Sequence, residues 1–122
     1  MDNSMIVIGL GARKGVDSKE VIDAIGEAIS ESGHHISQVK YLASAKLKEN
    51  ESGLIEASHI LGIELKFIPH DVLNNYNIPT PSQANRFGLI GVAEPAALAL
   101  SQNKKLVFKK RVYGRITVAI AE

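Results

Sequence analysis

Cysteine and tryptophan are absent from this chain of 122 residues, and aromatic residues make up only 5% of it. Without cysteine the protein has no disulfide bonds, no thiolate ligands for zinc and no cysteine nucleophile. No apolar run approaches the ~20 residues of a membrane-spanning helix, and the start of the chain is too polar for a signal peptide. We therefore expect a cytoplasmic protein that binds no membrane, no metal and no other cofactor.

The length and the composition are typical of one domain, which we expect to span residues 1–122. The apolar fraction of 45% is ordinary for a globular protein. The formal net charge is only +1, but residues 104–115 include six basic residues and no acidic residue. Such a segment attracts anions, or it protects an exposed edge strand from pairing with other chains.

The beginning of the chain has the pattern of a strand followed by a glycine-rich turn. The apolar run that starts at Ile6 predicts a buried strand, and Gly9, Gly11 and Gly15 predict a sharp turn after it. The spacing Gly-x-Gly-x-x-x-Gly is one residue longer than the dinucleotide-binding fingerprint, and no Gly-Lys-Ser/Thr sequence follows. The pattern therefore indicates a ligand-binding loop and no specific nucleotide motif.

The turn leads into a helix whose first amides form an expected anion site. Asp17 or Ser18 is placed to cap this helix by accepting its free N–H groups. Unpaired amides and the helix dipole together attract negative charge at a helix N-terminus. Arg13 and Lys14 add two cationic side chains beside it. We expect these groups to bind an anionic ligand.

Helix and strand patterns alternate along the rest of the chain, and a hairpin ends it. The pattern predicts an α/β fold: a three-layer sandwich with a mixed sheet of about five strands, helices on both faces and an antiparallel C-terminal hairpin. The expected elements are helices over 18–32, 51–62, 82–87 and 95–100, a helical turn over 69–75, strands over 41–46, 64–68, 106–110 and 115–121, and an extended connector over 78–82.

Side chains that carry chemistry lie at the expected strand ends and helix starts. Ser44 and Lys46 stand at the carboxyl end of the second strand, where ligands collect in open α/β sheets. Glu94 precedes Pro95 at a helix start, so it caps that helix or acts as a general base. Tyr113 is a hairpin-turn residue or a ligand contact. The candidate ligand-binding residues are Gly9, Gly11, Arg13, Lys14, Gly15, Ser44, Lys46 and Tyr113, and the candidate catalytic residue is Glu94.

Three stretches carry a family resemblance: GLGARKG at 9–15, LASAKLKENESGL at 42–54 and GVAEPAAL at 91–98. Together with residues 79–82 and 110–121, their order and spacing resemble the C-terminal domain of the CbiG family and its stand-alone relative CobE. The resemblance runs nearly from end to end. It implies a role in cobalamin (vitamin B12) biosynthesis, in which CbiG proteins open the lactone ring of cobalt-precorrin-5A and release acetaldehyde.

The resemblance also implies a ligand and a partner. The ligand is a polycarboxylated corrin intermediate at the precorrin-5 stage, which Arg13 suits through paired hydrogen bonds and Lys14 and Lys46 suit as point charges. We expect the protein to lack the N-terminal domain of full CbiG proteins, for which 122 residues leave no room. A separate CbiG N-terminal half or other enzymes of the pathway are therefore the expected partners.

Two functions of different classes follow from these observations. The chain is a module that binds or carries a corrin intermediate, or it is itself a cobalt-precorrin-5A hydrolase with Glu94 as the base. Binding of nucleic acid is not expected, because the basic segment has no interleaved aromatics beyond Phe108 and Tyr113 and no known docking motif. In either function, we expect seven of the candidate residues to converge at one edge of the sheet, namely Gly9, Gly11, Arg13, Gly15, Ser44, Lys46 and Glu94.

Overall fold

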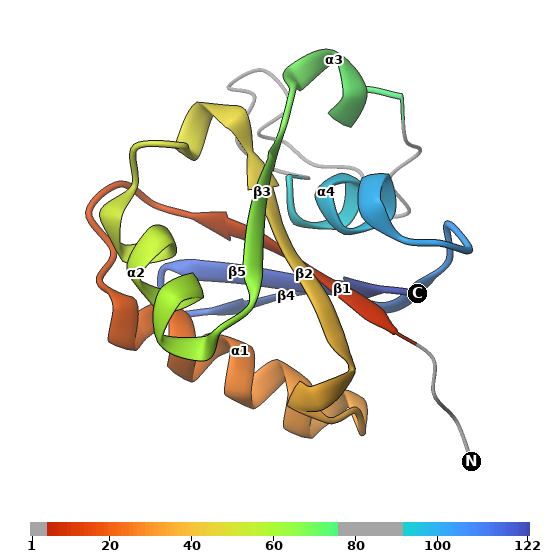
Figure 1. Ribbon diagram of the computed structural model, residues 1–122, viewed down its shortest axis with the longest axis horizontal. Coiled ribbons are helices and arrows are strands. Elements are labelled where there is room, and N and C mark those ends of the chain that lie inside the picture. The colour runs from red at the N-terminus through yellow and green to blue at the C-terminus, as the bar shows by residue number, and fades with distance from the viewer. Residues whose placement is uncertain (1–4, 76–91) are drawn as a thin grey trace.

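The computed structural model describes residues 5–75 and 92–122, which form one five-stranded sheet with helices on both faces (Figure 1). The strands follow the order β3-β2-β1-β5-β4 across the sheet. In chain order the elements are β1 (Ile6–Ala12), α1 (Ser18–Ser32), the 3₁₀ turn η1 (Ile36–Gln38), β2 (Val39–Ala45), the 3₁₀ turn η2 (Lys46–Lys48), α2 (Ser52–Leu61), β3 (Glu64–Ile68), α3 (His70–Leu73), α4 (Ala93–Leu100), β4 (Leu106–Tyr113) and β5 (Ile116–Ala121).

The sheet is mixed, as the sequence predicts. Strands β1, β2 and β3 are parallel to one another, whereas β5 is antiparallel to both β1 and β4. The pairing of β1 with β5 joins the two ends of the described chain in the middle of the sheet, with Val7 opposite Ala121 and Ala12 opposite Ile116. The predicted C-terminal hairpin is confirmed as β4 and β5.

Helix α1 has the bounds that the sequence predicts. Val21, Ile25 and Ala28 are buried along one face, the spacing that an amphipathic helix requires. At its start Asp17 accepts the N–H of Glu20, and at its end Gly33 adopts the left-handed conformation, with φ of 77°. The cap and the glycine therefore define both ends of the helix.

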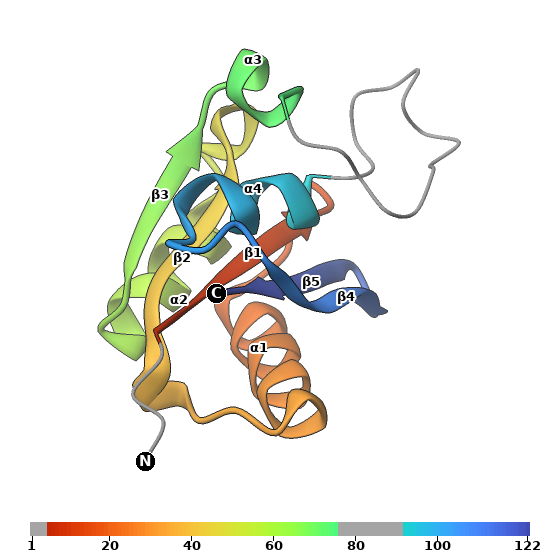
Figure 2. The same cartoon turned by 90° about the vertical axis from the view of Figure 1, so that its right-hand side faces the viewer.

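Helices lie on both faces of the sheet (Figure 2), and an apolar core lies on each face. Helices α1 and α2 cover the face to which β1 contributes Ile6, Ile8 and Leu10. Helices α3 and α4 cover the other face, where four of the nine buried residues of the core are alanines of β2 and α4. The three-layer arrangement predicted from the sequence is confirmed. Among the described residues, no helix is long and apolar enough to cross a membrane.

Strand β1 continues through two glycines for which the sequence pattern predicts a turn. Gly9 and Gly11 lie inside the strand, and the turn begins only after Ala12, so the predicted turn at these two glycines is wrong. Gly9 is required instead by close packing, because a Cβ there would lie 1.9 Å from the carbonyl oxygen of Ala93 in α4. Gly15 has φ of 87° and does lie in the turn.

Other element bounds differ modestly from the predictions. Strand β2 ends at Ala45, so Lys46 begins a 3₁₀ turn and is not part of the strand. Helix α4 begins at Ala93, which makes Pro95 its third residue. Proline is tolerated there because the first N–H groups of a helix have no partner within it. The predicted connector over 78–82 and the helix over 82–87 lie outside the described residues.

Candidate functional site

The turn over residues 13–15 connects the carboxyl end of β1 to α1. Gly15 adopts positive φ, and the backbone N–H of Arg13 donates to the carbonyl of Arg115 at 3.1 Å. On the other side, a Cβ on Gly53 would lie 2.2 Å from the carbonyl oxygen of Val16, so α2 packs directly against the chain that leaves the turn. The turn is therefore held from both sides.

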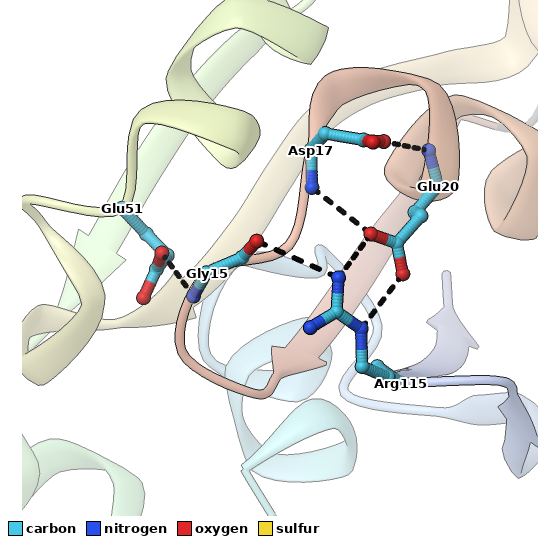
Figure 3. Close-up of polar contacts among 5 residues, drawn as sticks. All are labelled: Gly15, Asp17, Glu20, Glu51 and Arg115. Carbon is cyan, nitrogen blue, oxygen red and sulfur yellow. Dashed lines mark hydrogen bonds and ion pairs between the residues drawn. The ribbon is translucent and has the colours of Figure 1, made fainter.

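The amides expected to bind an anion are bonded to carboxylates of the protein itself (Figure 3). The N–H of Gly15 donates to Glu51 Oε1 at 3.0 Å. Asp17 and Glu20 form a capping box, in which each side chain accepts the backbone N–H of the other, at 2.8 Å and 3.2 Å. A ligand carboxylate would therefore have to displace Glu51 to reach the amide of Gly15.

Arg115 completes this network from the β4–β5 hairpin (Figure 3). Its Nε donates to Glu20 Oε2 at 2.9 Å, and one terminal nitrogen contacts Glu20 Oε1 and the carbonyl of Gly15. The hydrogen bonds from Arg115 hold the pKa of the Glu20 carboxyl below its usual value. The guanidinium of Arg115 therefore supports the turn and is already bound.

Three exposed cations remain at this edge of the sheet. Arg13, Lys14 and Lys46 are exposed, and within the described part of the chain their side chains form no hydrogen bond or ion pair. The first two lie on the turn after β1 and the third follows β2, which is the parallel neighbour of β1. Parallel neighbours end at the same edge of a sheet, so these cations share the edge where ligands collect in open α/β folds.

Ser44 lies near this edge but is not exposed. Its side chain is fully buried, and its hydroxyl donates to the carbonyl of Leu10 at 2.7 Å. Strand β2 thus bonds to β1 through a side chain as well as through the backbone. The structure gives Ser44 a structural contact, and its predicted role as a ligand contact stays a prediction.

Glu94 occupies a buried position beneath the start of α4. Val92 is the N-cap residue and no side chain caps the helix, so the predicted capping role of Glu94 is wrong. Its Oε2 instead accepts the backbone N–H of Lys110 at 3.0 Å. This N–H is available because β4 places three steps, from Phe108 to Arg111, against two steps of β5, which is a β-bulge.

Tyr113 is the last residue of β4 and contacts α1. Its hydroxyl donates to Glu31 Oε1, to which Arg111 also donates at 3.0 Å. Burial and the neighbouring Glu31 carboxylate raise the pKa of Tyr113 to about 12. Tyr113 therefore belongs to a cluster with Glu31 and Arg111, which no hydrogen bond joins to the turn over 13–15 in the described part of the chain.

Sequence reasoning missed the residues that hold the turn. The Asp17-x-x-Glu20 spacing is a recognisable capping-box signal, but Glu51 and Arg115 contact the turn from 36 and 95–100 residues away. No local pattern indicates such distant contacts. Across the described ranges, no three histidine, aspartate or glutamate side chains lie together as a metal site would require.

Comparison with known proteins gives consistent matches. Residues 6–121 match the profile of the family described as "Cobalamin synthesis G C-terminus". The cobalt-precorrin-5A hydrolase of Priestia megaterium is 30% identical over 119 residues, which are 96% of this chain and 32% of that protein. The chain therefore spans about a third of the length of this curated relative.

Two solved structures share both sequence and fold with the chain. The crystal structure of CobE, a protein from the cobalamin (vitamin B12) biosynthetic pathway, is similar with a TM-score of 0.86 at 28% identity, over 96% of this chain and 89% of CobE. The cobalamin biosynthesis protein chiG from Agrobacterium tumefaciens has a TM-score of 0.76 at 32% identity, over 95% of this chain and 96% of chiG.

Proposed function

Because the chain belongs to the family of cobalamin synthesis G C-terminal domains, we propose that it binds a polycarboxylated corrin intermediate of cobalamin biosynthesis. Family membership confirms the resemblance drawn from the sequence and its assignment to cobalamin biosynthesis. The proposed binding groups are Arg13, Lys14 and Lys46 at the carboxyl ends of β1 and β2. A separate N-terminal half or another enzyme of the pathway is the proposed protein partner.

The single observation that carries this proposal is the set of three exposed cations beside a firmly held turn. Arg13 and Lys14 project from a segment whose backbone is bonded to Glu51 and Arg115 and packed against Gly53. Ordering of the backbone before binding lowers the entropy that a ligand must overcome. An arginine offers a carboxylate two parallel hydrogen bonds, and a lysine offers it a mobile point charge.

The basic segment over 104–115 contributes less to binding than its charge suggests. Arg111 is paired with Glu31, Arg115 is paired with Glu20, and the ammonium of Lys104 donates to the carbonyl of Ala99 at 2.8 Å. Half of the six cations in the segment therefore have partners inside the protein. This distribution favours the turn over the hairpin as the main anion-binding surface.

The name of the Priestia relative describes hydrolysis of cobalt-precorrin-5A by a protein about three times as long. We propose binding as the function of the present chain, because three exposed cations suit an anionic ligand. The candidate base Glu94, in contrast, accepts the backbone N–H of Lys110, and no side chain of the described residues forms a hydrogen bond with it that would activate it as a base. Hydrolysis has a direct test. The purified protein is incubated with cobalt-precorrin-5A, and acetaldehyde is measured. Its release, and the loss of that release in Glu94→Gln, would establish a hydrolase instead.

Binding is tested by titrating the protein with a corrin whose side-chain carboxylates are free and, separately, with the same corrin as its methyl esters. We expect the free acid to bind and the ester to bind at least tenfold more weakly. Arg13→Ala is expected to weaken binding of the acid by about tenfold, the effect of one charge-assisted contact of about 1.4 kcal/mol.

Two lysines of the same strand region provide a matched comparison. Lys46→Ala removes a cation at the carboxyl end of β2, whereas Lys40→Ala removes one near its amino end. Only the first is expected to lower affinity. Equal effects of the two variants, or equal binding of acid and ester, would refute the proposed surface.

A further inference from the structure

Glu94 has one carboxylate oxygen with a partner and one without. Its side chain is fully buried, Oε2 accepts the N–H of Lys110 at 3.0 Å, and Oε1 is enclosed without a hydrogen-bond partner. Within residues 5–75 and 92–122 it is the one buried side-chain oxygen or nitrogen in this condition. Buried polar atoms in folded proteins nearly always have partners, so this oxygen requires an explanation.

The structure offers no role in folding for the second oxygen. Glu94 does not cap α4, and it forms no ion pair in the described part of the chain. A glutamine would accept the N–H of Lys110 equally well through its side-chain oxygen. Burial of a polar oxygen without a hydrogen-bond partner opposes folding, so folding alone does not explain the position of Oε1.

The surroundings hold Oε1 in a defined place. The bond from Lys110 restricts rotation of the carboxylate, and the bulge in β4 supplies that bond. Helix α4 is itself held close to β1, since the carbonyl of Ala93 occupies the space that a Cβ on Gly9 would fill. The acceptor is therefore fixed before any ligand arrives, as binding groups in functional sites generally are.

We propose that Oε1 of Glu94 is a binding position for a hydrogen-bond donor, an O–H or N–H group, of the molecule that the protein binds. An ionised carboxylate oxygen accepts hydrogen bonds and donates none, so the proposed ligand group is a donor. This inference rests on the proposed function, in that the same corrin would contact the cations through its carboxylates and Glu94 through a donor group. It adds a second kind of contact, which selects ligands by a donor and not by charge.

The test substitutions separate the two oxygens. Glu94→Gln keeps an acceptor for the N–H of Lys110 but places an NH₂ donor where Oε1 lies, so it opposes a ligand donor. We expect the variant to be as thermally stable as the parent or more stable, and to bind the free-acid corrin at least tenfold more weakly. Glu94→Asp keeps the charge but withdraws both oxygens by one methylene, and is expected to weaken binding as well.

Ser101→Ala is the matched control at the opposite end of α4. Its side chain is also buried and polar, but its hydroxyl donates to the carbonyl of Leu98 at 3.1 Å and so has its partner inside the protein. We expect its affinity to stay within twofold of the parent. A similar loss of affinity in Ser101→Ala and Glu94→Gln would show a general effect on α4 and overturn the proposal.

The remaining outcomes also decide the question. Unchanged affinity in Glu94→Gln overturns the proposal but leaves the proposed function intact, provided that Arg13→Ala weakens binding. A Glu94→Gln variant that fails to fold overturns it too, because the carboxyl group would then be needed for folding. If the parent protein binds no corrin, both the proposed function and this inference fall.

Discussion

Replacement of Gly9 by alanine introduces one methyl group at the point where α4 lies closest to β1. The new Cβ would lie 1.9 Å from the carbonyl oxygen of Ala93 and 2.8 Å from the backbone nitrogen of Ala97. Both neighbours are backbone atoms of α4, so no side chain can rotate away. Ordinary contact begins at 3.4 Å, so the helix would have to move by about 1.5 Å, the difference between 3.4 and 1.9 Å.

We expect Gly9→Ala to lower the free energy of unfolding by about 3 kcal/mol or more, the upper end of the range for overpacked cores. The displaced helix cannot keep its other contacts, because Ala96 and Ala97 are fully buried in the core between α4 and the sheet. For a domain of this size each kcal/mol lowers Tm by about 4 °C, so we expect a fall of about 12 °C. Thermal unfolding followed by circular dichroism measures it.

Gly11→Ala is the matched control on the same strand and the same face. The nearest atom to its added Cβ would be Cβ of Thr117 at 3.6 Å, an ordinary contact, and Gly11 does not have positive φ. We expect its stability to stay within about 0.5 kcal/mol of the parent. If the two alanine variants unfold at the same temperature, the close approach of α4 to Gly9 is not what requires glycine.

Two further predictions concern the ionic contacts. Arg115→Gln removes the guanidinium that lowers the pKa of Glu20. The resulting loss in the free energy of unfolding should be full at pH 7, where Glu20 is ionised, and should shrink as the pH falls below 4.5, the usual pKa of a glutamate. An equal loss at pH 3 and pH 7 in urea unfolding would contradict this. Tyr113→Phe should cost about 1 kcal/mol through the lost bond to Glu31 and should remove the tyrosine that ionises at about pH 12 in an ultraviolet titration. In the parent, the contribution of that bond should be full between the usual pKa of 4.5 for Glu31 and the usual pKa of 10 for Tyr113. It should be lost as the pH rises through about 12 and also as the pH falls below 4.5, where Glu31 becomes protonated.

The sequence predicts those helices and strands whose bounds are determined by neighbouring residues in the chain. The bounds of α1 follow from a helical repeat, from Asp17 before it and from Gly33 after it, all within one stretch of sequence. The C-terminal hairpin likewise follows from two apolar runs separated by a glycine-containing turn. The mixed sheet is then implied by parallel strand–helix alternation followed by this hairpin.

The features that the sequence does not predict depend on contacts between segments that are distant in the chain. The sequence around Gly9 is typical of a turn, but glycine is required there because the backbone of Ala93, far along the chain in α4, leaves no space for a Cβ. The N–H of Gly15 donates a hydrogen bond to Glu51, which is distant in sequence. Glu94 likewise accepts a hydrogen bond from the backbone N–H of Lys110, which a bulge in β4 leaves available. The sequence shows which residues are cations, but only the fold shows which of them form ion pairs, as Arg111 does with Glu31 and Arg115 with Glu20.

The pairing of β1 with β5 has a consequence for the order in which the protein assembles during synthesis. Strands β1, β2 and β3 are made before β5 and are neighbours along the sheet, but the second edge of β1 stays unpaired until residues 116–121 have been made. A contact between segments this far apart also forms slowly, because a long loop must close first. The nascent chain therefore carries an open, apolar strand edge from the time β1 is made until β5 is made, and unpaired strand edges are prone to wrong pairing.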